Sequence, residues 1–402
     1  MITTAPHRLP FIGHTHHLRD PLRFIRILQN GAPLTHIHLG GYPMIYIADP
    51  ELIHEVLVND HIYDRGGLFF DRVEEFLGLG LGNVLHQDHR PTRRAMQPHF
   101  TQKKTLGYHD IIQRHADELT KDWKPDTPID IFSEVQRTLV AITLELFFGA
   151  PFSAEEVDAV VTAMEDQFAN VLYRMAAPPL LRDIPTKKNR KFKAGRSYLI
   201  QFTRDQVSKH SGKAGIIAHL KEAGLDHDTI ADNARTLLFA GSEATGSTTC
   251  WALMFTNGSR QRLLATNPQE VERTIYEALR LYPSSWFLTR FTNQPTRLAG
   301  NPIPAGTHFA FSPYGVHHDP RYHRDPGTFD PDRWINPPTS HTFIPFAGGP
   351  RRCLGDNLTF NEVSQILTTI ARQWNWRTTL TPPKATISII PENVQLIVKP
   401  IR

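Results

Sequence analysis

The sequence predicts a mainly α protein with small β-sheets, an α+β chain in which helices dominate. Apolar residues recur at helical spacing, with breaks, from His89 to about residue 260. Short β-type runs with many Pro and Gly residues fill the chain from Pro283 to residue 350, and further runs lie near its two ends. Strands and helices do not alternate along the chain, so we expect no doubly wound parallel sheet.

The elements near the start of the chain are short. Residues 36–47 alternate around Gly40 and Gly41, which predicts a β-hairpin. Asp49-Pro50 begins a helix that runs to about residue 58. Residues 60–85 show weak periodicity and many Gly and Phe residues, so we expect a long ordered loop there.

Helices make up the middle of the chain. Ser153-Ala-Glu-Glu is typical of a capping box that opens a helix. The Pro-rich stretch 177–186 interrupts the pattern, another helix begins near Lys187, and two more are expected at about 230–256 and 268–281. A last long helix begins just after Cys353 and ends near Trp374, and residues 386–401 alternate as a hairpin. No linker separates two cores, so we interpret residues 1–402 as a single domain.

Composition limits the functional classes. Charged residues make up 21% and hydrophobic residues 40% of the chain, and no stretch is long and apolar enough for a membrane span. Only two cysteines occur, which fits a reducing compartment, and we expect a cytoplasmic monomer. No nucleic-acid motif accompanies the net charge of +4, so we expect no nucleic-acid partner. The histidines at 14, 16 and 17 have no further ligands spaced to complete a metal site and are expected in a solvated loop.

One decapeptide carries the chemistry, Phe346-Ala-Gly-Gly-Pro-Arg-Arg-Cys353-Leu-Gly355. A cysteine that precedes a long helix is stabilised as a thiolate by the helix dipole. Glycines allow a backbone to approach a flat ligand closely, and arginines supply charge for carboxylates. A buried structural cysteine beside a loop is the alternative interpretation.

The decapeptide matches the pattern F-x-x-G-x-R-x-C-x-G at every fixed position, and it resembles the haem-binding loop of the cytochrome P450 family. The resemblance covers nearly the whole chain. It implies a helix-rich triangular prism around a buried haem b, with Cys353 as the thiolate ligand of the iron. It also implies that Phe346 packs near this thiolate and that Arg351 binds a haem propionate.

Further motifs resemble the same family. Glu277 and Arg280 lie one helical turn apart and match E-x-x-R, with Arg333 as the third member of a structural triad. His89 and Arg93 resemble the H-x-x-x-R helix that faces the haem, although a solvated basic helix would also explain them. Together with these two residues, the resemblance makes Arg290 a propionate candidate.

The helix expected at 230–256 resembles the oxygen-binding helix of the family. Ala240 and Gly241 would leave room for O2, and Glu243 occupies the acid position of the proton relay. Ala244 stands where the family usually has a threonine whose hydroxyl helps to deliver the second proton. Three readings stay open: a substrate hydroxyl or an ordered water supplies the proton, Thr245 does so, or the reaction depends less on that hydroxyl, as in oxidative coupling. Of the three, we favour delivery assisted by the substrate or by water.

By resemblance, a hydrophobic substrate would contact four regions, unless several of their side chains belong to the core: the loop 60–85, the two helices that flank 177–186, the start of the oxygen-binding helix, and residues 285–288. The residues singled out come from the first, third and fourth of these regions. They are Phe69, Phe70, Phe76, Leu77, Val84, Leu238, Phe239, Trp286 and Leu288. Residues 64–67 and 279–283 look similar to bacterial enzymes that oxidise terpenes, with a polyketide or another macrocyclic substrate as the rival.

The implied activity is a monooxygenase that uses O2 to hydroxylate a hydrophobic natural product. No flavin or nicotinamide fingerprint is present, so electrons are expected from a separate ferredoxin or flavodoxin with its reductase. The residues Arg94, Arg351 and Arg352 would form a basic face for such an acidic partner. A peroxide-using peroxygenase and a non-catalytic haem sensor are the rival functions, and Glu243 argues for the reductive cycle over the first of them.

Overall fold

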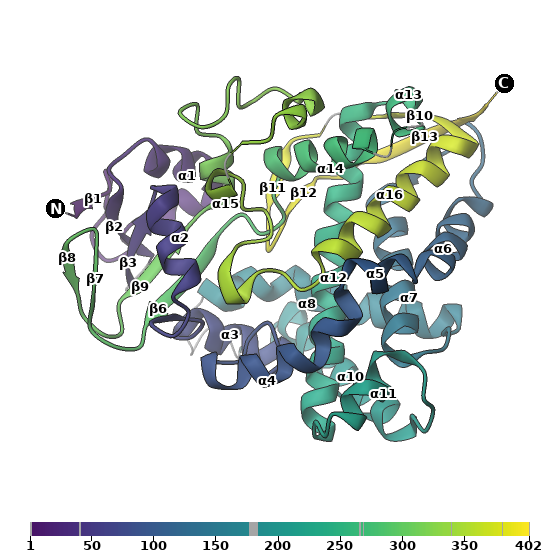
Figure 1. Cartoon of the computed structure of the whole chain (residues 1–402), viewed down its shortest axis with the longest axis horizontal. Helices are drawn as coiled ribbons and strands as arrows, with labels where there is room; N and C mark the ends of the chain where they lie inside the picture. The colour runs from purple at the N-terminus through teal and green to yellow at the C-terminus, as the bar shows by residue number, and fades with distance from the viewer. Residues whose placement is uncertain are drawn as a thin grey trace. The chain divides into compact units, whose positions relative to one another are not determined.

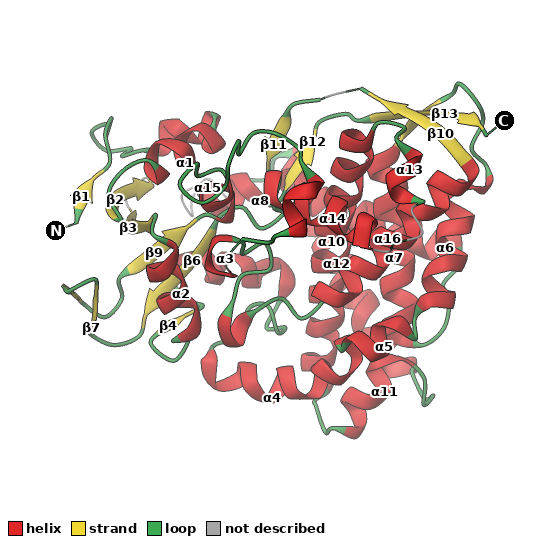
Figure 2. Cartoon of the chain, turned by 45° about the horizontal axis from the view of Figure 1, so that its top comes forward, coloured by secondary structure: helices red, strands yellow, loops and turns green. Residues whose placement is uncertain are grey.

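The computed structural model describes residues 2–39, 42–176, 184–264, 267, 269–338, 340–379 and 381–401. Internal contacts divide the chain into two compact units, each with its own hydrophobic core (Figure 1). Unit 1 comprises residues 1–70, 276–353 and 383–390, and unit 2 comprises residues 71–275, 354–382 and 391–402. Strands gather in unit 1, whereas unit 2 consists mainly of helices (Figure 2).

Unit 1 is built on a six-stranded sheet with the order β1-β2-β3-β9-β6-β4. Its strands are β1 (Thr3–Thr4), β2 (Leu34–Leu39), β3 (Tyr42–Ile47), β4 (Tyr63–Asp64), β6 (Leu288–Thr292) and β9 (His308–Phe311). β2 and β3 pair antiparallel, which confirms the predicted hairpin, although its two central glycines lie outside the described residues. β3 pairs parallel with β9, with Ile45 opposite Phe309 and Ile47 opposite Phe311. These four side chains are buried and form the centre of the unit 1 core.

Short elements complete unit 1. They are η1 (Thr15–Arg19), α1 (Pro21–Gln29), α2 (Pro50–Val58), β7 (Thr296–Leu298), β8 (Asn301–Ile303), α15 (Pro313–His317), η3 (Pro331–Ile335), η4 (Ser340–Thr342), η5 (Gly349–Arg351) and β11 (Pro383–Ala385). Three elements cross a boundary between the units: α3 (Leu68–Leu77), α14 (Gln269–Leu281) and β12 (Ile389–Pro391). The Asp49 side chain caps α2 by accepting from the N–H groups of Glu51 and Leu52, as the Asp-Pro start predicts.

Unit 2 is organised around α12 (His227–Thr256), which packs against α7 (Ile131–Phe148), α10 (Lys187–Lys209) and α16 (Asp356–Gln373). Its other elements are α4 (His86–Met96), η2 (Gln97–Phe100), α5 (Gln102–Leu106), α6 (His109–Lys121), β5 (Pro128–Asp130), α8 (Ala154–Ala176), α11 (Gly215–Glu222), α13 (Arg260–Leu263), β10 (Trp374–Thr378) and β13 (Gln395–Pro400). α12 is buried along most of its length because apolar residues occur around its whole circumference.

Several helix ends are where the sequence predicts them. Ser153 and Glu156 form the reciprocal hydrogen bonds of a capping box before α8. α10 begins at Lys187, with the Thr186 hydroxyl as its N-cap. α16 begins three residues after Cys353. The break between α8 and α10 falls largely on residues 177–183, which lie outside the described part of the chain.

Two predictions are wrong. Residues 60–85 are not one long loop, because they contain β4 and the helix α3, whose apolar and acidic residues alternate at helical spacing. The tail 386–401 is not a hairpin: β12 pairs with β11, whereas β13 lies between β10 and β5. Strand alternation reveals a strand but not its partner, so the sequence misassigned the pairing.

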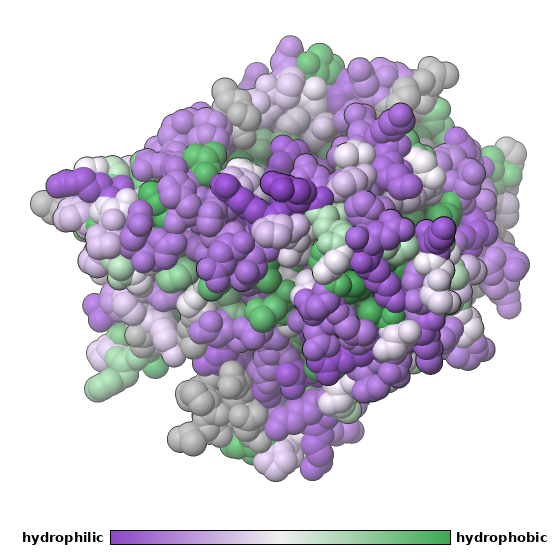
Figure 3. Space-filling model, turned by 60° about the horizontal axis from the view of Figure 1, so that its bottom comes forward, coloured by the Kyte–Doolittle hydropathy of each residue, from purple (hydrophilic) through white to green (hydrophobic). Residues whose placement is uncertain are grey.

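None of the helices in the described part of the chain combines the length and apolar character that crossing a bilayer requires. The face drawn in Figure 3 is mostly hydrophilic, and hydrophobic residues show on it in small separate groups.

Candidate active site

In unit 1, backbone hydrogen bonds close the loop that presents Cys353. The N–H of Cys353 donates to the carbonyl of Phe346 at 3.0 Å, so the loop returns to its start. Gly349 has φ +65°, and a Cβ at this position would collide with the carbonyl of Leu57 at the end of α2. Only glycine therefore fits here, as expected for a backbone that turns tightly. Cys353 is exposed at the end of this fixed loop, whereas Cys250 is buried in unit 2.

A buried cluster of charges lies beside this loop in unit 1. The Nη2 of Arg351 donates to Asp64 at 2.6 Å, and its Nε donates to Asp60 at 3.4 Å. All three side chains are almost fully buried. Arg351 therefore cannot contribute to an exposed basic face, which corrects the sequence-based interpretation. Its guanidinium is instead held by Asp60 and Asp64 in the interior of unit 1, beside the cysteine loop.

Arg290, on β6, belongs to the same cluster and is 2% exposed. Its Nη1 donates to the carbonyl of Thr289 at 2.7 Å, but its Nε and Nη2 are buried and have no hydrogen-bond partner among the residues that the structure describes. Burial and the nearby Arg351 lower its pKa to about 10, although Asp64 and Asp60 act in the opposite direction. A buried guanidinium with two unsatisfied donors is costly unless an anion completes its shell. These donors fit the carboxylate of a haem propionate.

The structure brings Glu277, Arg280 and Arg333 together in unit 1. Arg280 donates two hydrogen bonds to Glu277, at 2.9 and 2.8 Å, and both side chains are completely buried. Arg333 reaches the same carboxylate at 3.5 Å. Arg280 also donates to three backbone carbonyls between residues 317 and 328. The arrangement therefore fastens α14 to the segment that follows α15, which is a structural role.

In unit 2, one strip in the middle of α12 stays accessible, whereas the residues on either side of it are buried. Ala240 is exposed, and Leu237, Gly241 and Ala244 are partly buried. These positions follow the spacing i, i+3, i+4 and i+7, so they lie on one face of the helix. Three of the four are Ala or Gly. The strip therefore offers a smooth surface without large side chains.

Two polar residues of α12 flank this strip and are buried. Glu243 is 6% exposed and Thr245 is 1% exposed. The Thr245 hydroxyl lies 3.5 Å from the hydroxyl of Thr359 on α16, also in unit 2. Because Thr245 follows Ala244 by about 100° around the helix, its hydroxyl faces α16 and does not occupy the place that a threonine at 244 would have.

The predicted haem-facing pair lies on α4. His89 is buried and Arg93 is partly buried. They are four residues apart and so share one face of the helix. Both belong to unit 2, as do the α12 residues.

The residues predicted to line a substrate pocket divide into two groups. Phe76, Leu238 and Phe239 are buried in the unit 2 core, where the rings of Phe76 and Phe239 meet edge to face at 5.8 Å. Leu77 packs against this core and Val84 is buried.

In unit 1, Phe70, Trp286 and Leu288 are partly buried, and the Trp286 Nε1 donates to the carbonyl of Thr386 at 3.0 Å. The Phe69 side chain lies outside the described part of the structure.

The sequence did not single out several residues that complete these clusters. Asp60 and Asp64 pair with Arg351 across 291 and 287 residues of the chain, and no local signal marks them. Trp334 donates to Glu277 at 3.0 Å, and Thr359 meets Thr245. A hydroxyl at the fourth position of α16 is too common to predict a contact.

The sequence profile of the family described as Cytochrome P450 matches residues 4–257 and 270–400 of this chain. Similar curated proteins include cyclooctatin synthase of Streptomyces melanosporofaciens, which is 32% identical over 93% of this chain and 90% of its own length. Pentalenene oxygenase of Streptomyces avermitilis is 29% identical over 94% and 92% of the two chains. Cyclooctat-9-en-7-ol 5-monooxygenase of Streptomyces melanosporofaciens is 29% identical over 93% and 89%.

Proposed function

The chain belongs to the cytochrome P450 family and is a monooxygenase, and from this premise we propose that it hydroxylates a terpene. The loop that fixes Cys353 carries the proposal, because it presents a thiol at the end of a rigid backbone turn. The names of the related proteins support the substrate class, since pentalenene and cyclooctat-9-en-7-ol are terpenes. Oxidation or oxidative coupling of a polyketide is the alternative for the substrate.

The cofactor is a thiolate-ligated haem, and we propose haem b, with Cys353 as the ligand of its iron. Arg290 would bind a propionate through its two buried, unsatisfied donors, and His89, Arg93 and Arg351 are the further candidates. Phe346 would pack near the sulfur. When bound, such a haem supplies the cleavage of the O–O bond, which thiolate donation favours.

Residues of α12 would handle oxygen and protons. The strip that contains Ala240 and Gly241 leaves room for O2, and the buried Glu243 would pass a proton inward. Thr245 is a poor substitute for the missing hydroxyl at 244, because its own hydroxyl faces Thr359. We therefore propose that a substrate hydroxyl or an ordered water completes the proton path beside Ala244.

The substrate would contact apolar side chains from the predicted set. Phe70, Leu77, Trp286 and Leu288 are partly buried and could change their exposure on binding. Four other residues of the predicted set are buried core residues: Phe76, Val84, Leu238 and Phe239. They would lie beneath the side chains that contact the substrate and would limit its size. Phe69 stays a predicted pocket residue, because its side chain lies outside the described part of the structure.

Electrons must reach the haem from a redox partner, and we propose an acidic ferredoxin or flavodoxin with its reductase. Arg94 and Arg352 are exposed and could meet such a partner, whereas Arg351 is buried. We also propose that residues 1–402 act as one functional domain and as a monomer.

Replacing the proposed ligand tests this function. We expect Cys353→Ser to lose the absorption that a reduced, thiolate-ligated haem shows with CO, because a hydroxyl does not replace the thiolate. Cys250→Ala is the matched control, since the second cysteine is buried in unit 2 and should leave the band unchanged. Survival of the band in Cys353→Ser would refute the ligand assignment. Spectral titration with terpene hydrocarbons, terpene alcohols and macrolactones would then identify the substrate class.

A second substitution tests the proton path. With Ala244→Thr we expect little gain in the fraction of NADH consumption that yields product, because substrate or water already delivers the proton. Coupling is measured with the native substrate and a ferredoxin system. A large gain in coupling would show that a hydroxyl at 244 is what the enzyme lacks and would exclude assisted delivery.

A further inference from the structure

Large hydrophobic side chains are exposed together near the start of unit 1. Phe11 is fully exposed, and Leu9 and Ile12 are 43% and 46% exposed. Leu18, on η1, and Tyr42, at the start of β3, are nearly half exposed as well. Five of the twelve large hydrophobic residues classed as exposed in the described chain therefore lie within its first 42 residues. We call Leu9, Phe11 and Ile12 the apolar tip.

The apolar tip is held outward by its backbone and is not a frayed end. Leu9 and Gly13 exchange two backbone hydrogen bonds, at 2.9 and 3.0 Å, which close the loop below Phe11. Gly13 has φ +59°, and a Cβ there would collide with His38 of β2. The next residue, His14, is fully buried, and its N–H donates to the His38 carbonyl at 2.6 Å. The sheet therefore fixes the loop, and the exposure of Phe11 is part of the fold.

Positive charge lies close to the apolar tip: Arg8 precedes Leu9, and Arg19 and Arg23 line the same hollow as His7. Residues 2–48 contain four arginines and six histidines but only one acidic residue, Asp20. Arg8, Arg19 and Arg23 are exposed, and within the described residues none of them forms an ion pair. The Asp20 carboxylate is occupied as the N-cap of α1, where it accepts from the N–H of Arg23 at 3.1 Å. The three guanidinium groups are therefore available to an external anion.

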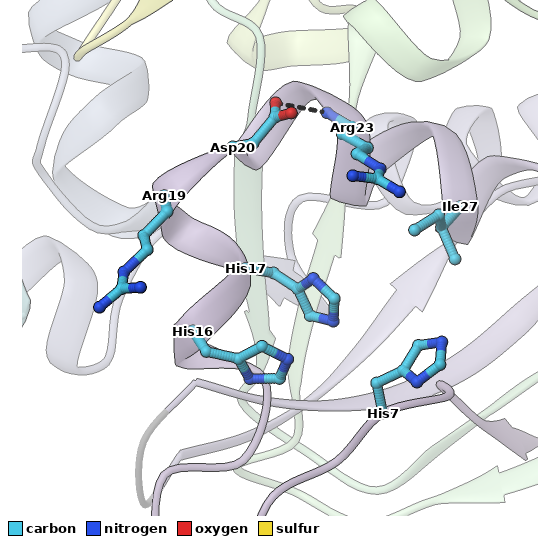
Figure 4. A pocket seen from close by; sticks show the side chains of 7 residues that line it. All are labelled: His7, His16, His17, Arg19, Asp20, Arg23 and Ile27. Atoms are coloured by element: carbon cyan, nitrogen blue, oxygen red, sulfur yellow. Dashed lines mark hydrogen bonds between the residues drawn. The ribbon is translucent and has the colours of Figure 1, made fainter.

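Figure 4 shows a hollow in which the imidazoles of His7, His16 and His17 approach one another from two segments. Arg19 points away from them. The rings of His16 and His17 lie 4.0 Å apart, and His17 stacks on Phe24 at 4.4 Å.

Stacked rings present their faces rather than converging lone pairs, and no group of three or more ligands suited to a metal ion occurs among the described residues. Burial and the neighbouring histidines lower the pKa of His17, so this ring adds no charge at neutral pH. The fixed charge comes from the arginines. The burial of His14 also corrects the expectation that all three histidines of this segment lie in a solvated loop.

We propose that the apolar tip docks this protein on the surface of an anionic phospholipid bilayer. Phe11 and Ile12 would enter the interfacial layer, where aromatic and aliphatic side chains gain most from leaving water. Arg8, Arg19 and Arg23 would face the headgroups, whose negative surface potential attracts arginines near the membrane. Neither feature suffices alone for stable attachment, and their combination within residues 8–23 supplies both signals.

This docking goes beyond the proposed monooxygenase reaction, but it suits a hydrophobic substrate. An apolar substrate partitions into lipid, so an enzyme held at the surface meets it at a higher local concentration. Vesicle binding is measured without turnover, and its outcome is therefore independent of whether the substrate is a terpene.

The test is cosedimentation of the full-length holoprotein with vesicles. We expect binding to vesicles of phosphatidylcholine with phosphatidylglycerol and little binding to phosphatidylcholine alone. The double variant Phe11→Ser, Ile12→Ser should bind the anionic vesicles about tenfold or more weakly. Replacing Arg8, Arg19 and Arg23 by Gln should weaken binding by about fivefold per residue, on the order of 100-fold in total. High salt should reduce binding of the unmodified protein but have little effect on the Gln variant.

Ile335→Ser is the matched control, because Ile335 is 60% exposed in the same unit but follows Asp330 and Asp332, and the nearby Arg333 is mostly buried and pairs with Glu277. It should bind vesicles like the unmodified protein. Circular dichroism checks that each variant is folded, which the high exposure of the substituted side chains favours. Equal sedimentation of the tip variant and the unmodified protein would refute the proposal. So would a tip variant that binds vesicles normally but accepts electrons from an acidic ferredoxin more slowly, since the tip would then serve a protein partner.

Discussion

Arg290 has two buried donors that no other described residue satisfies, and its proposed contact with a haem propionate rests on them. A buried guanidinium normally has carboxylates or carbonyls around it, and Arg351, in the same cluster, has Asp60 and Asp64. Arg290 has one carbonyl for Nη1 and a contact of 5.9 Å with the ring of Phe311. The proposed propionate would satisfy the other two donors, so part of the cost of haem binding would already be met when the protein folds.

We expect Arg290→Met to have opposite effects on the apoprotein and the holoprotein. Without haem, the substitution removes a buried unsatisfied charge, so the free energy of unfolding should rise by about 1–3 kcal/mol. With haem, a propionate loses its partner, so haem should dissociate faster by at least tenfold. Urea unfolding of the apoprotein and haem transfer to apomyoglobin measure the two effects.

Arg297→Met is the control, because Arg297 is an exposed arginine on β7 whose Nη1 donates to a backbone carbonyl. It should change neither quantity by more than about 0.5 kcal/mol. A less stable apoprotein in Arg290→Met would contradict this account, since it would mean that the guanidinium already has partners.

The sequence predicted the role of a residue correctly where its partner is close by in the sequence. Glu277 and Arg280 are one turn apart on a helix, so their pairing follows from the spacing. Arg351 could not be assigned in this way, because Asp60 and Asp64 reach it through the tertiary fold. The neighbouring Arg352 suggested a basic surface for both residues, whereas the structure buries Arg351 and leaves Arg352 exposed.

At the scale of elements, a polar network in unit 2 fastens three helices together. Arg174, near the end of α8, is buried and pairs with Glu75 on α3. Its Nη1 donates to Asn189 on α10 at 3.3 Å, and its guanidinium lies 4.4 Å from the ring of Phe192. Arg72 on α3 donates back to the carbonyl of Arg174 at 2.6 Å. The network therefore fixes α3 and the two helices that flank residues 177–183.

Arg174→Met should loosen these helices locally. The methionine keeps apolar contact with Phe192 but leaves Glu75 without its buried partner, so we expect a loss of about 1–3 kcal/mol in stability. Amide hydrogen exchange should quicken in α3 and in the first turns of α10, while α6 is unchanged. Arg137→Met is the control: its pair with Asp158 is largely exposed and should contribute about 1 kcal/mol or less. Uniform quickening across unit 2 would indicate global destabilisation in place of a local fastening.

Elements were predicted well where capping and periodicity agree and poorly where either is weak. α10 and α12 both begin one residue after a side-chain N-cap. α3 was missed because glycines flank it on both sides and suggested a loop. The pairing of β13 with β10 and β5 was missed because alternation does not specify which strands are neighbours.

For the whole molecule, buried histidines predict how stability depends on pH. His317, His318 and His323 follow β9 in unit 1, and burial lowers the pKa of all three, that of His318 to about 3. His317 must be neutral, because its Nε2 accepts a hydrogen bond from the N–H of Ile344 at 2.9 Å. In the unfolded chain these three histidines bind protons below about pH 6.5, whereas in the folded chain they bind protons only at a lower pH. Stability is therefore complete above that pH and is lost as pH falls below it.

We expect the free energy of unfolding to fall between about pH 7.5 and 5.5, by up to roughly 4 kcal/mol for three histidines. His317→Gln keeps an acceptor for Ile344 and removes one titrating group, so the decrease should shrink by about a third. Urea unfolding followed by circular dichroism at the two pH values measures it. The control is His109→Gln, at an exposed position on α6. A pH dependence that His317→Gln leaves unchanged would assign the effect to other groups.

The order of strands in the unit 1 sheet has a consequence for synthesis on the ribosome. Ile45 of β3 pairs with Phe309 of β9, so the sheet joins segments that emerge 264 residues apart. At ~5–20 residues per second, the edge of β3 waits on the order of 10–50 s for its partner. Unit 2, whose helices form locally, can begin to fold during that interval. A nascent chain stalled before residue 309 would expose this open strand edge, which makes the early hairpin the segment that most needs chaperone protection.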